Sequence, residues 1–239
     1  MNKVNFDLLK NSTINFKNLF SICVGKVYSN KLEFIDYLEG FEKWDTDLDT
    51  GKLIIDEKSF DVQYLGSVTY NDNMWFSAEL EKGIPEEYVK LLIESRKSMK
   101  NYNVKDFYPI KVKTDDKITG EMLGIICTAF IPNKEICFFN GKAEGVNLYM
   151  VVNKNEENPD LFKNLTQNIS AEKFIPRVME IISKYNIDHK LMIKSFLLDN
   201  NCTYDEDENI LIGNFLNDVK IKFVFDEEGK LLNAESQLN

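Results

Sequence analysis

Apolar positions recur every three or four residues near the start of the chain. The positions with this spacing are Phe16, Leu19, Phe20, Cys23 and Val27. The spacing predicts a helix within residues 14–38 that buries one face, with a break near Ser29 and Asn30.

Between residues 42 and 80 the apolar period shortens to two. The alternating segments are KLIID, FDVQYLGSVT and NMWFSAEL, at residues 52–56, 60–69 and 73–80. Polar turn residues separate these segments, so the region is predicted to form antiparallel strands joined by hairpins.

Helical and strand-like patterns alternate along the rest of the chain. A helix is predicted at residues 84–103, where Pro85 suits a first turn, and another at residues 115–130. Strands are predicted at residues 135–141 and 145–152. Two further helices, at about 170–185 and from Asp188 onward, precede a closing set of strands. Asp188 is the expected N-cap of the second of these helices.

A polar segment at residues 153–164, which contains Pro159, is the predicted boundary between two parts. Residues 1–155 would hold the first helix, the sheet and its helices. Residues 165–239 would hold a helix pair and the C-terminal strands, packed on the first part as one unit. This organisation predicts an α+β fold with a mostly antiparallel, hairpin-connected sheet and helices packed around it.

The stretch WDTDLDTGKLIID, residues 44–56, resembles a calcium loop in composition. Counted from Asp45, however, the sixth position of an EF-hand loop is Thr50, and the glycine comes one residue late at Gly51. The twelfth position is Asp56, which is shorter than the bidentate glutamate found there in EF-hands. The stretch is therefore interpreted as an acidic hairpin turn, with a calcium-binding structural protein as a remaining alternative.

Composition narrows the environment and the partners. The chain has 239 residues, a net charge of −10 and 44% hydrophobic residues, as expected of a packed globular protein. The negative charge disfavours binding to nucleic acid and to an anionic membrane surface. The start MNKVNFDLLKN lacks the apolar run of a secretory signal, and the scattered cysteines are typical of buried thiols in a reducing compartment. A cytoplasmic location is expected.

Several enzyme classes lack the residues that they need. His189 is the only histidine, which excludes sites that require two, and no phosphate-binding glycine loop is present. His189 follows the expected cap residue, so it is interpreted as an exposed residue of the first helical turn rather than as a catalytic base. Glu79 and Glu121 are the carboxylates in the most apolar surroundings. No catalytic residue, metal site or cofactor is assigned.

A polar-floored pocket is the most specific site hypothesis. Gln63 lies in an alternating strand, and Trp44 and Trp75 lie on flanking strand candidates. Two indoles around a buried amide would line such a pocket, to which Glu79 and His189 are added as candidates. Ordinary core and cross-strand packing explains the same residues.

The same residues carry a family resemblance. The order of Trp44, Asp47 and a turn glycine, then VQYLGS, then the Trp75 strand running into GIPEEYV, resembles a family of uncharacterised bacterial proteins with a domain of unknown function. The resemblance continues in IDHKLMIKSF, where Asp-His opens a helix, and in the closing IKFVFDEEGKLL. Family members often carry tryptophans at alternate positions of the strand that here reads NMWFSAEL, whereas this chain has Trp75 alone there. The resemblance implies no activity, substrate or cofactor.

The sequence thus favours a non-enzymatic cytoplasmic protein that binds a protein partner with a basic surface. A hydrolase that uses carboxylates in a cleft near Trp44, Gln63 and Trp75 is the alternative. An exposed apolar surface would favour the first interpretation, and a concave apolar pocket with convergent polar groups would favour the second.

Overall fold

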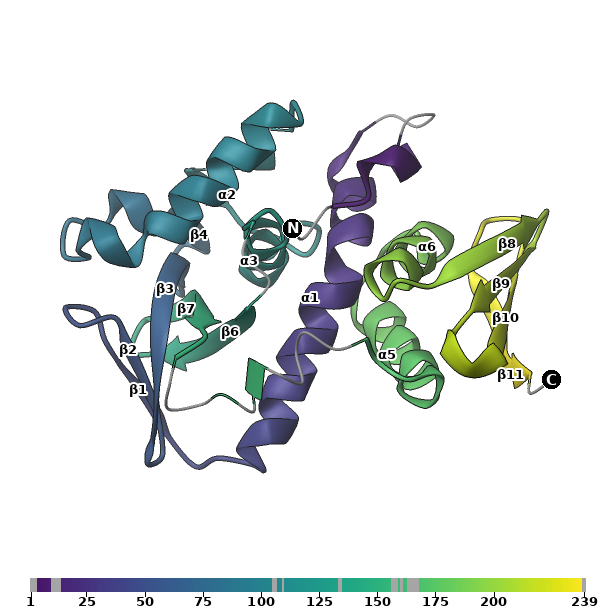
Figure 1. The fold of residues 1–239 in the computed structure, drawn as a ribbon. Helices are drawn as coiled ribbons and strands as arrows, with labels where there is room; N and C mark the ends of the chain where they lie inside the picture. Colours follow the sequence, from purple (N-terminus) through teal and green to yellow (C-terminus); the bar gives the residue numbers. More distant parts are fainter. Residues whose placement is uncertain are drawn as a thin grey trace. The chain divides into compact units, whose positions relative to one another are not determined.

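The computed structural model describes residues 4–9, 14–104, 107–108, 110–132, 135–155, 159, 161–162 and 168–237. Much of the predicted boundary segment, including residues 156–158 and 163–164, lies outside the described residues. Contacts divide the chain into two compact units (Figure 1). Unit 1 comprises residues 30–166 together with the first two residues, and unit 2 comprises residues 3–29 and 167–239.

The elements confirm the α+β class with antiparallel sheets. The described α-helices are α1 (Phe16–Leu38), α2 (Lys90–Asn101), α3 (Gly120–Ala129), α5 (Ala171–Lys184) and α6 (His189–Asp199). Short 3-10 turns are η1 (Phe6–Leu9), η2 (Ala78–Leu80), η3 (Glu86–Tyr88) and η5 (Leu216–Asp218). The strands of unit 1 are β1 (Trp44–Asp47), β2 (Lys52–Ile55), β3 (Lys58–Thr69), β4 (Met74–Ser77), β5 (Lys111–Lys113), β6 (Ile136–Ala143) and β7 (Val146–Asn153). Those of unit 2 are β8 (Thr203–Asp207), β9 (Ile210–Asn214), β10 (Lys220–Phe225) and β11 (Leu231–Gln237).

The long strand β3 organises the sheet of unit 1. It pairs with β2 and β4 along one edge and with β7 along the other, and β6 pairs with β7. A bulge between Tyr64 and Gly66 shifts the register of β3 against β7. Because a bulge inserts one residue, side chains beyond it exchange faces relative to simple alternation.

A helix packs on each face of this sheet, through aromatic side chains on one face and through a close approach at a glycine on the other. Phe34 of α1 packs edge-on against Phe60 and Phe139, with ring centroids 5.2 and 5.8 Å away. On the opposite face, α3 approaches the sheet so closely that a side chain at Gly124 would lie 2.6 Å from the Phe138 ring. The predicted helix at residues 115–130 is therefore confirmed in its second part, from Gly120.

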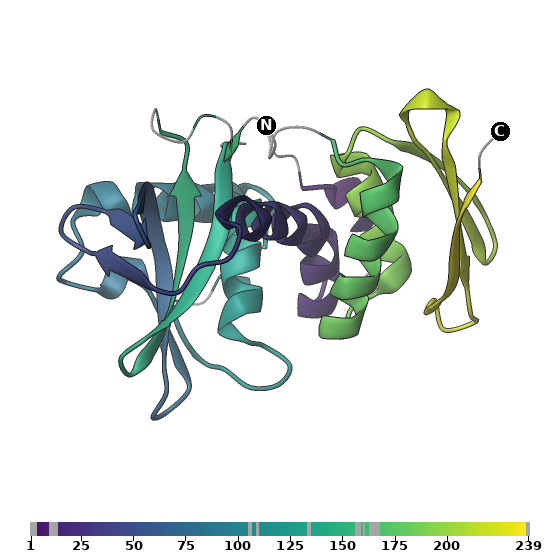
Figure 2. The ribbon, with the colours of Figure 1, turned by 90° about the horizontal axis from the view of Figure 1, so that it is seen from below.

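Unit 2 has a four-stranded sheet in the order β11-β10-β9-β8, with α5 and α6 on one side (Figure 2). Phe174 of α5 stacks on Phe196 of α6 at 4.5 Å and reaches Phe223 of β10 at 6.1 Å. The N-terminal part of α1 belongs to the same core, where Phe20 meets Tyr185 edge-on at 5.1 Å. Contacts thus group residues 3–29 with the C-terminal strands, which periodicity along the chain does not indicate.

Two expected helix boundaries are wrong. The helix α1 runs from Phe16 to Leu38 without the break predicted near Ser29 and Asn30. The predicted helix at residues 84–103 begins only at Lys90, because Val89 has a non-helical ψ of 5° and a separate 3-10 turn precedes it. Asp188 does cap α6, since its carboxylate accepts the Leu191 N–H at 2.8 Å.

The contact between α1 and α6 in unit 2 depends on a glycine. A Cβ at Gly25 would lie 2.7 Å from the Cβ of Phe196, which leaves no room for a methyl group. We therefore expect Gly25→Ala to lower the free energy of unfolding by about 1–3 kcal/mol through overpacking, despite the better helix propensity of alanine. Urea denaturation would measure this change. Gly83→Ala is the control, since no atom lies within 4 Å of its added methyl group, and an equal loss there would contradict the packing explanation.

Candidate functional site

The acidic stretch at residues 44–56 forms a hairpin, as predicted. The strands β1 and β2 pair in register from Trp44–Ile55 to Asp47–Lys52. The Asp47 carboxylate accepts the backbone N–H groups of Asp49 (2.9 Å) and Thr50 (3.3 Å), and hydrogen bonds from Thr50 and Asp49 lower its pKa. Gly51 supplies the positive φ of 62° that the turn requires. The carboxylate at the centre of the turn therefore organises the backbone.

The base of the hairpin is held in the same way. The Asp56 carboxylate accepts the N–H groups of Glu42 and Lys43 at 3.1–3.3 Å. Among the described residues, no group of three or more histidine, cysteine, aspartate or glutamate side chains is arranged to hold a metal ion.

The Gln63 amide is satisfied by the backbone at the start of α2. Its nitrogen donates to the Glu87 carbonyl at 2.7 Å, and its oxygen accepts the Leu91 N–H at 3.0 Å. Gln63 therefore joins β3 to the chain segment that leads into α2. The side chain is half-buried, and both the nitrogen and the oxygen of its amide are hydrogen-bonded.

The two indoles lie on opposite faces of the unit 1 sheet. Trp44 packs edge-on against Phe139 at 5.8 Å, on the face that α1 covers. Trp75 packs against Tyr149 at 5.3 Å, and Tyr149 shares its face with Gly66. The expected pocket bordered by both indoles is thus corrected: only Trp75 shares a face with Gln63.

Glu79 lies in an ion pair. Both of its carboxylate oxygens lie 3.0 Å from Nη1 of Arg96, whose guanidinium is 5.7 Å from the centroid of the Tyr108 ring. The Tyr108 hydroxyl shares a 3.2 Å hydrogen bond with Ser77, and burial raises the pKa of Tyr108. This cluster ties η2, α2 and β4 together.

His189 belongs to unit 2 and is half-buried rather than exposed as predicted. Its Nδ1 accepts the Leu231 N–H at 3.0 Å, so the ring joins the first turn of α6 to the start of β11. Burial lowers the pKa of the imidazole. The neutral ring is the form that can accept this hydrogen bond.

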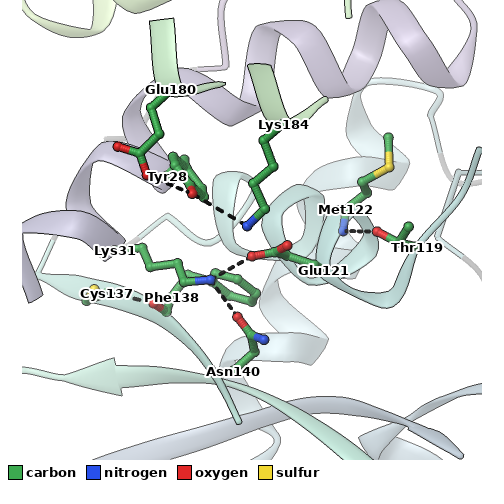
Figure 3. Close-up of polar contacts among 10 residues, drawn as sticks. All are labelled: Tyr28, Lys31, Thr119, Glu121, Met122, Cys137, Phe138, Asn140, Glu180 and Lys184. Carbon is green, nitrogen blue, oxygen red and sulfur yellow. Dashed lines mark hydrogen bonds and ion pairs between the residues drawn. The ribbon is translucent and has the colours of Figure 1, made fainter. Parts of the chain in front are cut away.

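A cluster of polar side chains, the Lys31 centre, consists of Lys31 of α1, Glu121 and Asn140. The sequence indicates it only in part. The Lys31 ammonium lies 2.6 Å from Glu121 of α3 and 2.7 Å from the side-chain oxygen of Asn140 of β6. It also lies 5.5 Å from the centroid of the Phe138 ring (Figure 3). The Lys31 and Glu121 side chains are 14% and 18% exposed, so this pair is largely withdrawn from water.

The position of Glu121 in an apolar helix is the sequence signal for this centre. Lys31 lies 90 residues earlier in the chain, and nothing local to it indicates the contact. Tyr149 lies close to the same helix, because a Cβ at Gly120 would lie 2.5 Å from its hydroxyl. Burial raises the pKa of Tyr149, with a further contribution from the Glu121 charge. The phenol therefore stays neutral.

A second polar group surrounds Tyr28 within unit 2. Its hydroxyl bonds to Glu180 at 3.1 Å, and the Lys184 ammonium lies 3.5 Å from the same oxygen (Figure 3). Lys184 also lies 4.8 Å from the centroid of the Tyr28 ring. These contacts join α1 to α5.

The four thiols are buried, as predicted, and burial suppresses their reactivity. It raises the pKa of Cys127 to about 12 and raises the pKa of Cys137 and Cys202 as well. A thiol with a raised pKa carries little of the thiolate that acts as a nucleophile.

The chain belongs to a family whose function is not known. The model of the Family of unknown function (DUF6882) matches residues 17–154, which is more than half of the chain. The matched range contains the acidic hairpin, Gln63, both indoles and the Lys31 centre. It ends before His189 and the closing strands. No curated protein and no solved structure matched the chain. Within the described residues, no helix is long and apolar enough to cross a membrane.

The Lys31–Glu121 pair can be compared with an exposed pair of the same length. Lys154 and Glu135 are also 2.6 Å apart, but their side chains are 47% and 44% exposed. We expect a double-mutant cycle with Lys31→Met and Glu121→Gln to give a coupling energy of about 1–3 kcal/mol, because water screens this pair little. The matched cycle with Lys154→Met and Glu135→Gln should give less than about 1 kcal/mol. Equal couplings in denaturant unfolding would contradict a special role for the Lys31 centre.

His189 should make unfolding depend on pH. A lowered pKa in the folded state means that the unfolded chain binds more protons near the ordinary imidazole pKa of 6.5. Stability from the neutral ring is then complete above that value and decreases as the pH falls toward the lowered pKa. His189→Asn keeps an acceptor in place of Nδ1 but does not titrate. Urea unfolding at pH 7.5 and pH 5 should show a smaller loss at low pH for this variant than for the wild type; the same loss would reject the assignment.

Proposed function

We propose that this protein is a non-enzymatic cytoplasmic binding protein, and that the β1–β2 hairpin of unit 1 docks a partner protein with a basic surface. Residues 39–61 carry eight carboxylates and three lysines, a net charge of −5, which is half of the charge of the whole chain. An acidic surface of this kind attracts a basic partner over several ångströms.

Exposed apolar side chains lie among these carboxylates, and this is the observation that carries the proposal. Phe41, Leu48 and Ile54 are 38%, 38% and 42% exposed. Phe41 adjoins Glu42, Leu48 lies between two aspartates in the turn, and Ile54 lies opposite Asp45 in the register. Surfaces that bind proteins combine apolar contacts with a charged rim in this way.

The hairpin is also a pre-organised surface. Its turn and base are fixed by carboxylate-to-backbone hydrogen bonds, and Thr46 bonds to the Tyr64 hydroxyl at 2.7 Å beneath it. A rigid surface loses little conformational entropy when a partner binds.

The chemical groups of the chain support binding over catalysis. The single imidazole accepts a backbone hydrogen bond, Glu79 and Glu121 lie in ion pairs, and the thiols are buried. The alternative hydrolase cleft near Trp44, Gln63 and Trp75 gains no support, because the indoles occupy opposite faces.

The proposal predicts salt-sensitive binding that depends on three carboxylates. Asp45→Asn, Asp49→Asn and Glu57→Gln together leave Asp47 and Asp56 in place, so the hairpin should keep its shape. Proteins captured from a lysate of the producing cells would be purified and titrated directly against the pure chain. We expect a basic partner to bind the triple variant about tenfold more weakly, from roughly 0.5 kcal/mol per charge.

The matched control neutralises three exposed carboxylates elsewhere, through Asp116→Asn, Glu144→Gln and Glu227→Gln. It should bind the partner as tightly as the wild type does. Leu48→Ser should weaken binding without changing its salt dependence. A purified partner that binds the hairpin variant and the control variant equally well would refute the hairpin as the docking surface.

A further inference from the structure

The two edges of the unit 2 sheet differ in charge. The edge strand β8 carries three consecutive acids, and its Glu206 is paired with Lys190 and Lys194 at 2.7 and 2.6 Å. The edge strand β11 has the sequence LLNAESQ, with Glu235 as its one charged residue. Among the described residues, β11 pairs with β10 alone. Edge strands with few charges are the ones that accept another strand.

The hydrogen-bond pattern shows which groups of β11 point outward. In a strand that lies between two antiparallel neighbours, the backbone N–H and C=O groups of successive residues point alternately to one neighbouring strand and to the other. The Phe225 N–H donates to the Asn209 carbonyl at 2.9 Å, so Phe225 and every second residue before it face β9. Val224 and Lys222 therefore face β11.

The partners of those two residues are Asn233 and Glu235, whose backbone groups face β10. Ala234 and Ser236 consequently direct their N–H and C=O groups away from the sheet. Their side chains are small and uncharged, so they do not block an approaching strand. The one bulge lies at the start of the strand, beside Phe225, and leaves the rest in regular register.

The start of this edge is already occupied. The Leu231 N–H donates to His189, and Leu232 is the extra residue of the bulge, so an added strand would meet Leu232 at the end of the regular segment. Leu232 is 67% exposed, which is unusual for a leucine in a strand. An apolar side chain beside unpaired backbone groups favours pairing with another strand.

We propose that β11 pairs antiparallel with β11 of a second copy of this chain, so that two four-stranded sheets join into one across a two-fold axis. With the axis at Ala234, Leu232 lies opposite Ser236 of the second copy. Glu235 then lies opposite the neutral Asn233 of the second copy and keeps its own neighbour Lys222, 3.8 Å away.

Other pairings are less favourable. With the axis at Glu235, two carboxylates would lie directly opposite each other, which destabilises a strand pair. Pairing of β11 with β8 of another copy would leave a free edge at each end, so copies would add without limit into an open chain. The acids of β8 also disfavour the addition of a strand at that edge. A two-fold pairing at β11 closes after two copies.

The test is the mass of the full chain in solution. Sedimentation equilibrium should find a species of twice the 27.8 kDa chain mass at high protein concentration. Ser236→Pro removes an outward N–H and none of the bonds to β10, so it should return the mass to one chain with an unchanged melting temperature. Ser236→Ala is the control and should remain a dimer.

A cysteine substitution tests the register without proline. Under an added oxidant, Ala234→Cys should link two chains, because the two positions 234 would be opposite each other at about 5.5 Å between Cα atoms. Ser236→Cys should not link to itself. A monomeric wild type at every concentration, a dimer that survives in folded Ser236→Pro, or linkage through residue 236 in place of 234 would each overturn the proposal.

Discussion

One helix supplies side chains to the cores of both units, and the rest of the structure depends on it. The N-terminal part of α1 presents Phe20 to Tyr185 in unit 2, and its C-terminal part presents Phe34 to Phe60 and Phe139 in unit 1. Burying aromatic side chains of this size contributes a large share of the stability of a small core. Neither unit can be described without its part of this helix, although the family match covers residues 17–154 and so ends before the C-terminal part of unit 2.

Much of the fold follows from local signals. The period of two predicted the central strands, the Asp and Gly residues predicted the hairpin, and Asp188 was identified as a cap. The break expected in α1 is absent because Ser29 and Asn30 are buried, 0% and 8% exposed, and tertiary packing continues the helix through them. Polarity in the sequence could not reveal that burial.

The candidate pocket is absent because no face of the sheet carries Gln63 together with both indoles. Simple alternation along β3 places Tyr64 and Val68 on one face, and with them both indoles, but it places Gln63 on the opposite face. The bulge between Tyr64 and Gly66 adds a residue, so Val68 and its partner Trp75 move to the face of Gln63, while Trp44 stays on the Tyr64 face. A bulge of one residue leaves no mark in the hydrophobic pattern. Of the Lys31 centre, the sequence indicates only Glu121, because a glutamate is unusual in that apolar helix. Its partner Lys31 is too distant in sequence for a local pattern to indicate the contact.

The helix α1 continues through Ser29 and Asn30, and hydrogen exchange of its backbone amides tests this continuity most directly. An unbroken helix with both halves in packed cores predicts slow exchange through Ser29, Asn30 and the following turn, comparable to that of the flanking turns. Fast exchange confined to residues 29–33, between two slowly exchanging segments, would show two separate helices and would contradict a continuous α1.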